Sequence, residues 1–234
     1  MPKFGLTKTI GSWSLEKYKL LRIMYLKHLE ANTGRKSVCV DAFAGCGTYY
    51  LQQAEKPKKI DGSPLIAAKM KPGFDKLVFI ESDKTVFDEL KHNTKRFKPT
   101  LYNADAHEIL PQIIPELMAK NTSVAMFLDP CSLDLPKELM HELAEIPRLD
   151  LAINFLSSFV HRTAHTEKGR NDINKLYGHS AWQQTTGKGT IQKHANQYCK
   201  VLHSIFPYVT APMSVLNSGN RAVYHIIMAS TYGK

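Results

Sequence analysis

Three acidic residues each directly follow, or stand close behind, a short apolar run that predicts a β-strand: Asp41, Glu81 and Asp105. Because the carboxyl ends of strands converge on one edge of a doubly wound sheet, we expect the three side chains to line one crevice. A carboxylate at the second strand can accept both hydroxyls of a ribose, and one beside the third can accept from an adenine amino group. Asp41 would then serve an ammonium group, directly or through water. Helix capping is the alternative role for such residues.

The turn after the first of these strands lies in the stretch V-C-V-D-A-F-A-G-C-G-T-Y-Y, residues 38–50. Ala44, Gly45 and Gly47 are small, so the backbone can approach a ligand closely and leave its amides accessible. A dinucleotide fingerprint needs a third glycine, but Tyr50 stands at that position. The turn and the three carboxylates together favour S-adenosylmethionine over NAD as the cofactor.

Strand and helix patterns alternate along the chain, which predicts an α/β protein with a mostly parallel sheet and helices on both faces. We expect a single domain over residues 1–234.

A polar loop is expected at 52–59, and Ser63 is expected to cap a helix that begins with Pro64. A helix at 13–30, capped by Ser12 or Ser14, has a polar face that includes Lys17. The predicted strands are 38–41, 77–80, 100–102, 123–128 and 151–155, and an Asn/Gly turn at 217–220 joins 209–216 to 222–231 in a terminal hairpin.

Six motifs in order resemble the three-Cys-motif partner proteins, which look like class I S-adenosylmethionine-dependent methyltransferases: W-S-L-E-K-Y-K-L-L, D-A-F-A-G-C-G, D-G-S-P-L, F-I-E-S-D, N-A-D-A and F-L-D-P. The resemblance spans about residues 13–230. It implies a Rossmann-like, seven-stranded sheet with a reversed last strand, and a protein partner that carries three cysteines. The residues expected to bind the cofactor are Asp41, Phe43, Ala44, Gly45, Gly47, Glu81, Asp105 and Ala106.

Asp129 and Pro130 follow the clearest predicted strand, where class I methyltransferases place substrate-handling residues. One hypothesis is that Asp129 and the Pro130 carbonyl orient an exocyclic base amine, as in enzymes with a second proline and an aromatic residue at the next positions. Here Cys131 and Ser132 take those positions, so Phe155 or Phe159 would have to supply the stacking ring. A second hypothesis takes Cys131 as a covalent nucleophile. In a third, the protein methylates nothing.

Residues 160–188 are polar, basic and rich in His, Gly and Asn, and we expect an insertion or lid there that contacts substrate. Arg162 and Trp182 belong to its mixture of charges and rings, which is typical of single-stranded nucleic-acid grooves. A polar lid over the cofactor is the alternative. His161 and His165 have metal-ligand spacing, but no third ligand is evident nearby, so no metal is expected.

The net charge of +10 is uneven, at +7 for residues 1–60, −4 for 61–150 and +7 for 151–234. Positive flanks favour a nucleic acid or nucleotide as the substrate. The four cysteines form no C-x-x-C pair, which predicts free thiols. No segment predicts a membrane span or a secretory signal, so we expect a cytoplasmic protein.

These observations favour an S-adenosylmethionine-dependent methyltransferase. Two other classes remain open at this point: a cofactor-binding partner subunit without turnover, and a nucleic-acid-binding module that has kept the same sheet.

Overall fold

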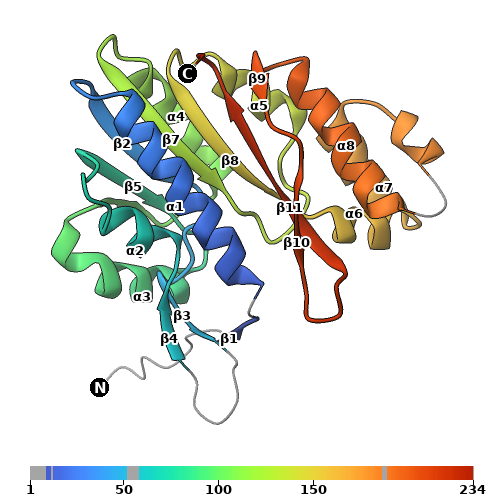
Figure 1. The fold of residues 1–234 in the computed structure, drawn as a ribbon, viewed down its shortest axis with the longest axis horizontal. Helices are drawn as coiled ribbons and strands as arrows, with labels where there is room; N and C mark the ends of the chain where they lie inside the picture. The colour runs from blue at the N-terminus through green and yellow to red at the C-terminus, as the bar shows by residue number, and fades with distance from the viewer. Residues whose placement is uncertain (1–8, 12, 52–57, 186–188, 234) are drawn as a thin grey trace. The chain divides into compact units, whose positions relative to one another are not determined.

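The structure is a computed structural model, and it describes residues 9–11, 13–51, 58–185 and 189–233 (Figure 1). The chain divides into two compact units, Met1–Phe127 and Leu128–Lys234, which we call the N-terminal and the C-terminal unit.

The core of the N-terminal unit is a parallel sheet in which β2 pairs with β7 on one side and β5 on the other, and β5 pairs with β6. The longer strands share an apolar, buried stretch, at 38–40 in β2, 78–80 in β5 and 124–128 in β7, as expected where helices cover both faces of a parallel sheet. Asp41 at the end of β2 is the register partner of Phe79 and of Phe127. The strand bounds are β2 Lys36–Asp41, β5 Lys76–Ile80, β6 Thr100–Tyr102 and β7 Thr122–Leu128, so all four predicted strands are confirmed.

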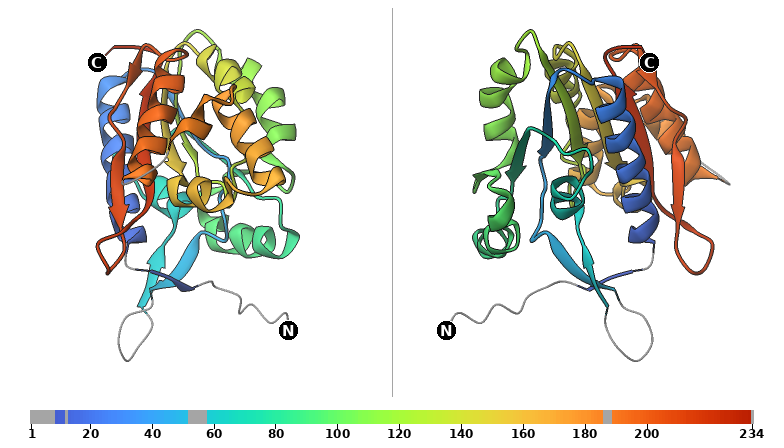
Figure 2. Two further views of the ribbon diagram at one scale, coloured as in Figure 1. Left: turned by 90° about the vertical axis from the view of Figure 1, so that its right-hand side faces the viewer. Right: turned by 60° about the vertical axis from the view of Figure 1, so that its left-hand side comes forward.

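Helices cover both faces of this sheet, with α1 and α4 on opposite sides of β2 (Figure 2). Their bounds are α1 Ser14–Ala31, α2 Ser63–Ala68, α3 Lys84–Thr94, the 3-10 turn η1 Lys95–Phe97 and α4 Ala106–Leu117. The expected caps were partly wrong. Ser14 is already helical and makes no cap, Ser12 lies outside the described residues, and Gly62 rather than Ser63 precedes α2.

One face of α1 packs inward, and its buried residues include Leu21, Met24 and Tyr25. Lys17 is buried as well, with 8% of its surface exposed, which corrects its expected place on the polar face. Its position one residue before Tyr18 and four before Leu21 puts it in the same helical stripe.

A second, three-stranded sheet in the N-terminal unit was not predicted. β3 (Thr48–Leu51) pairs antiparallel with β4 (Lys58–Asp61), and β1 (Thr9–Ile10) pairs parallel with β3. The polar loop expected at 52–59 is therefore wrong at Lys58 and Lys59, which are strand residues, while 52–57 lie outside the described residues. β3 begins directly after the turn that contains Gly45 and Gly47, which we call the glycine turn.

The C-terminal unit holds a second group of strands: β8 Leu149–Phe155, β9 Tyr208–Val209, β10 Met213–Leu216 and β11 Ala222–Ser230. β11 pairs antiparallel with β8, β9 and β10. The predicted terminal hairpin and its reversed last strand are confirmed. The first arm is interrupted between Val209 and Met213, so it forms two short strands rather than one.

The helices of the C-terminal unit are α5 Lys137–Ala144, α6 Ser157–Thr163, α7 Glu167–Tyr177, the 3-10 turn η2 Ala181–Gln184 and α8 Thr190–His203. The segment expected to be a polar insertion at 160–188 is thus mostly helical, and its last residues, 186–188, lie outside the described residues. Tyr177 is fully buried and Trp182 is 3% exposed. Both rings therefore help to form a core, whereas the sequence suggested that Trp182 belongs to a surface groove.

Among the described residues, no helix is long and apolar enough to cross a membrane.

Candidate functional site

Backbone hydrogen bonds bring the ends of β2, β5 and β6 together at one edge of the N-terminal sheet. The Ala44 amide, just after β2, donates to the Ile80 carbonyl at 2.9 Å, and the Glu81 amide donates to the Tyr102 carbonyl at 3.0 Å. Asp41, Glu81 and Asp105 therefore stand at the carboxyl ends of three adjacent parallel strands, as the sequence predicts. Such an edge is where open α/β sheets bind their ligands.

Glu81 holds the glycine turn to the end of β5. Its Oε2 accepts the Gly45 amide at 3.0 Å, and its Oε1 accepts the Asp83 amide at 2.8 Å. The side chain is only partly buried. A carboxylate offers about four lone-pair positions, so each oxygen retains one for a further donor. Glu81 can therefore bind two hydroxyls of a ligand while it keeps both backbone contacts.

The glycine turn has positive φ angles at Gly45 (+61°) and Gly47 (+80°), which explains the need for glycine at both positions. A Cβ on Gly45 would lie 2.1 Å from the Tyr49 hydroxyl oxygen. We expected these glycines to leave amides open to a ligand. That expectation is wrong for Gly45, because its amide donates to Glu81 and the Tyr49 ring occupies the place of a side chain.

Two further contacts fix the same turn. The Gly62 amide donates to the Gly47 carbonyl at 2.8 Å, and the Asn93 side chain on α3 donates to the Cys46 carbonyl at 2.8 Å. Tyr49 and Asn93 were not identified from the sequence, since no local pattern indicates that either one reaches the turn. The conformation of the turn is thus set by α2, α3 and β5 together.

Asp105 caps α4: its Oδ1 accepts the His107 amide at 2.8 Å, and Ala106 is the first residue of the helix. The alternative role as a helix cap is therefore present, and it uses one carboxylate oxygen. Phe43 is partly buried, and its amide lies 3.4 Å from Asp41 Oδ1. Ala44 and Ala106 are buried, which is consistent with close approach of the backbone at this edge.

Asp41 is fully buried, and like Cys39 it lies close enough to Tyr25 of α1 to affect that hydroxyl. Burial, with Asp41 nearby, raises the pKa of the Tyr25 hydroxyl and of the Cys39 thiol, so both are neutral. The Lys17 ammonium lies 5.2 Å from the centre of the Tyr18 ring and 5.9 Å from that of Phe127. Because Phe127 is the register partner of Asp41, this part of α1 brings a cation to the same edge of the sheet.

In the C-terminal unit, Asp129 accepts a hydrogen bond at Oδ1 from the Asn154 side-chain amide on β8. Asn154 is 3% exposed, and its own Oδ1 is buried without a hydrogen-bond partner among the described residues. Pro130 is buried and Cys131 is exposed. Asn154 was not identified from the sequence, although it is the one polar residue in the run L-A-I-N-F, and this exception could have drawn attention to it.

The residues expected to contact substrate are arranged differently from the prediction. The Phe155 ring is 2% exposed and stacks on Tyr198, with ring centroids 4.6 Å apart. Trp182 donates from its ring nitrogen to Asn174 Oδ1 at 2.7 Å. Neither ring presents a face for stacking a base, which corrects the expectation for Phe155 and Trp182. Arg162 is exposed, with its guanidinium 5.7 Å from the Phe159 ring centre.

A buried polar network surrounds His225 on β11. The Ser157 hydroxyl lies 2.7 Å from Nδ1, and Gln192 Oε1 lies 2.9 Å from Nε2. Burial lowers the pKa of His225 to about 4, so the ring is neutral near pH 7. Since Gln192 Oε1 can only accept, Nε2 carries the proton and Nδ1 accepts from Ser157.

All four cysteines are free thiols, as predicted, and three of them are buried: Cys39, Cys46 and Cys199. Within the described part of the chain, no three His, Cys, Asp or Glu side chains form a group that could hold a metal ion.

No family description matches this sequence, and no curated protein does. Solved structures do match. A Legionella pneumophila protein of family DUF519 has a TM-score of 0.57 at 9% identity, over 93% of this chain and 86% of that one. Spermidine synthase from Thermotoga maritima has a TM-score of 0.52 at 11% identity, over 92% and 60%. A Klebsiella pneumoniae protein described as an O-methyltransferase has a TM-score of 0.50 at 9% identity, over 92% and 80%.

At these identities the similarity establishes the fold. The chain has the Rossmann-like α/β fold of the class I S-adenosylmethionine-dependent methyltransferases, with a mostly parallel sheet, as predicted. It spans about three fifths of the length of the spermidine synthase.

Proposed function

We propose that the protein is an S-adenosylmethionine-dependent methyltransferase that acts on a nucleic acid or a nucleotide. One observation carries the cofactor assignment: Glu81 follows the second strand of the parallel sheet, holds the glycine turn through Gly45, and keeps lone pairs on both oxygens. A carboxylate with two such positions matches the two hydroxyls of a ribose.

The remaining cofactor roles follow from the chemistry of the neighbouring groups. Asp105 would accept from the adenine amino group with the carboxylate oxygen that does not cap α4. Asp41 would attract the ammonium group of the cofactor, and the Lys17 ammonium would attract its carboxylate. Phe43, Ala44, Gly47 and Ala106 would supply the close-packed surroundings. When bound, the cofactor supplies a methyl group on a sulfonium centre.

For the acceptor, we propose that Asp129 and Pro130 orient an amine. The hydrogen bond from Asn154 supports this role because it fixes one carboxylate oxygen of Asp129. The buried, unpartnered Oδ1 of Asn154 is a second acceptor beside it. An exocyclic amine has two N–H donors, which suits such a pair of acceptors. Attack by Cys131 is the competing hypothesis, and its exposed thiol is accessible.

Calorimetry with S-adenosylmethionine and with its demethylated product tests the cofactor. Failure of both to bind would exclude the enzyme. Transfer of a labelled methyl group to mixed RNA, DNA and protein pools then tests the reaction, and binding without transfer favours a partner subunit. Asp129→Ala should abolish transfer with the cofactor still bound, whereas Cys131→Ser should abolish it only if the thiol attacks the base.

We also propose, from the sequence motifs alone, that the protein belongs with the three-Cys-motif partner proteins, binds a protein that carries that motif, and works in the cytoplasm. Isolation from the native source at natural abundance tests the partner. A stoichiometric co-eluting chain with three cysteines in a motif supports it, and elution without any stoichiometric chain contradicts it.

A further inference from the structure

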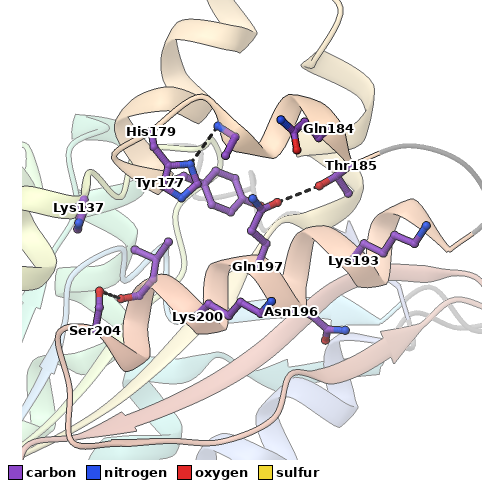
Figure 3. A pocket seen from close by; sticks show the side chains of 12 residues that line it. Lys137, Tyr177, His179, Gln184, Thr185, Lys193, Asn196, Gln197, Lys200 and Ser204 are labelled. Atoms are coloured by element: carbon purple, nitrogen blue, oxygen red, sulfur yellow. Dashed lines mark hydrogen bonds between the residues drawn. The ribbon is translucent and has the colours of Figure 1, made fainter.

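A cavity of about 630 Å³ opens in the C-terminal unit between α8 and the segment that runs from the end of α7 through η2. Figure 3 shows Lys193, Asn196, Gln197 and Lys200 along α8, with Gln197 pointing toward the segment that carries His179 and Thr185. Thr185 donates to Gln197 Oε1 at 2.9 Å across this space. Lys137 from α5 completes the lining on another side, so three lysines surround the cavity.

A second cavity of about 450 Å³ adjoins the first, since Thr185 lines both. Its lining includes Arg170, His161, His165 and His194. The Arg170 guanidinium donates to the His165 carbonyl at 2.9 Å, which holds it in place. His194 is 2% exposed, and within the described part of the chain its buried Nδ1 has no hydrogen-bond partner. We call the two cavities together the basic tract.

The described residues that line the basic tract include cations, neutral polar groups and a few apolar side chains and rings, but no Asp or Glu. Residues 157–206, which include most of the lining, hold seven Lys or Arg against two Asp or Glu, and five of the ten histidines. A concave surface with cations and without carboxylates selects an anion. The absence of lining carboxylates distinguishes it from an ordinary solvated surface, where both signs of charge are interspersed.

The side chains that line the basic tract indicate which part of a polyanion it would contact. Tyr177 and Trp182 line the cavities but are almost fully buried, so they offer no ring face on which a base could stack. Proteins that read single strands by stacking need such faces. Ammonium, guanidinium and amide donors are instead the groups that contact phosphate and sugar.

We propose that the basic tract binds the phosphodiester backbone of a nucleic acid without sequence preference, and that it holds the strand that carries the methyl acceptor. The second part rests on the proposed function, whereas the binding itself does not. Lys137, Lys193 and Lys200 neutralise phosphates in the first cavity, and Arg170 neutralises one in the second.

Fluorescence anisotropy with a labelled, mixed-sequence single-stranded RNA, measured over a series of salt concentrations, tests the proposal. Each phosphate contact contributes about −0.7 to the slope of log K against log salt for a single strand. The triple variant Lys137→Gln/Lys193→Gln/Lys200→Gln should therefore reduce the slope by about 2 and weaken binding by about 10- to 100-fold at low salt. The matching Lys→Arg triple variant keeps the charges and should bind like the wild type.

A matched control removes the same charge from exposed lysines of the N-terminal unit: Lys91→Gln/Lys95→Gln/Lys98→Gln. It should change the affinity by less than about threefold. Equal losses in the two Gln variants, or an unchanged slope in the tract variant, would overturn the proposal. So would a wild-type protein that binds acidic phosphopeptides or anionic vesicles but neither RNA nor DNA.

The binding and transfer experiments together distinguish failure of this inference from failure of the proposed function. RNA binding that depends on the tract, with no methyl transfer to any pool, leaves the inference standing and removes the enzyme. Methyl transfer to a nucleic acid that is unaffected by the tract variant removes the inference and leaves the enzyme.

Discussion

Replacement of Glu81 by alanine should weaken S-adenosylmethionine binding by about 100-fold. The carboxylate keeps one lone pair on each oxygen beside its contacts to the Gly45 and Asp83 amides. Hydrogen bonds to a charged group contribute about 1.5–3 kcal/mol each. For two ribose hydroxyls at a partly exposed side chain we take the lower end, about 3 kcal/mol, which corresponds to slightly more than two factors of ten in the dissociation constant.

The same substitution should also lower the melting temperature, because two backbone amides lose their acceptor. Water can reach this edge, so we expect a cost of about 1–2 kcal/mol, or roughly 2–8 °C for a chain of this size. Glu81→Gln is not conservative here. Its amide nitrogen must face either the Gly45 or the Asp83 N–H group, which opposes two donors.

Titration calorimetry on the folded variants measures the loss, with Glu116→Ala as the control. Glu116 pairs with Lys76 at the start of β5, the opposite end of the strand from Glu81, and hydrogen bonding by Lys76 lowers the pKa of its carboxyl. The control should bind the cofactor like the wild type. A Glu81→Ala protein that is folded and binds within about threefold of the wild type would refute the ribose assignment.

Three further predictions follow from the site. Gly47→Ala should lower the melting temperature by about 3–6 °C, because the φ of +80° at Gly47 is unfavourable for any residue with a side chain. The surroundings leave room for a methyl group, so the backbone conformation alone causes this loss. An unchanged melting curve would show that the turn tolerates a side chain. Asn154→Leu should reduce the turnover number at least tenfold without changing cofactor affinity, because Asn154 would both fix Asp129 and accept from the substrate amine, and a loss confined to cofactor binding would contradict that role. His225 has a pKa of about 4 in the folded protein, below its value of about 6.5 in the unfolded chain. The folded state is therefore fully stable with respect to this group above pH 6.5, and it loses stability as the pH falls towards 4. We expect about 2 kcal/mol between pH 7 and pH 4.5, and His225→Asn should flatten the melting temperature against pH over that range, whereas an equally steep profile would refute it.

Much of the sheet could be predicted because its strands are local apolar runs. The residues of β7 are all buried and all but the first two are apolar, and acidic residues mark the ends of β2 and β5. The Asn/Gly turn likewise indicated the terminal hairpin. The pairing of β3 with β4 could not be predicted, because Lys58 and Lys59 have low strand propensity. Their pairing partners, Leu51 and Tyr50, also come before an intervening stretch of the sequence.

Most of the wrong predictions about the site concern polar residues that the fold buries. Lys17 lies in the apolar stripe of α1, and Asn154 lies in an apolar strand, so residue type alone assigned neither correctly. Trp182 and Tyr177 stand among polar neighbours in the sequence, but contacts with α8 bury them. Their environment depends on long-range packing, which periodicity does not report.

A crystal structure with S-adenosylhomocysteine bound tests the central claim most directly. We predict both ribose hydroxyls within about 2.5–3.0 Å of the two Glu81 carboxylate oxygens, with the Gly45 contact retained. A ligand bound elsewhere, or a ribose that Glu81 does not contact, would contradict the account.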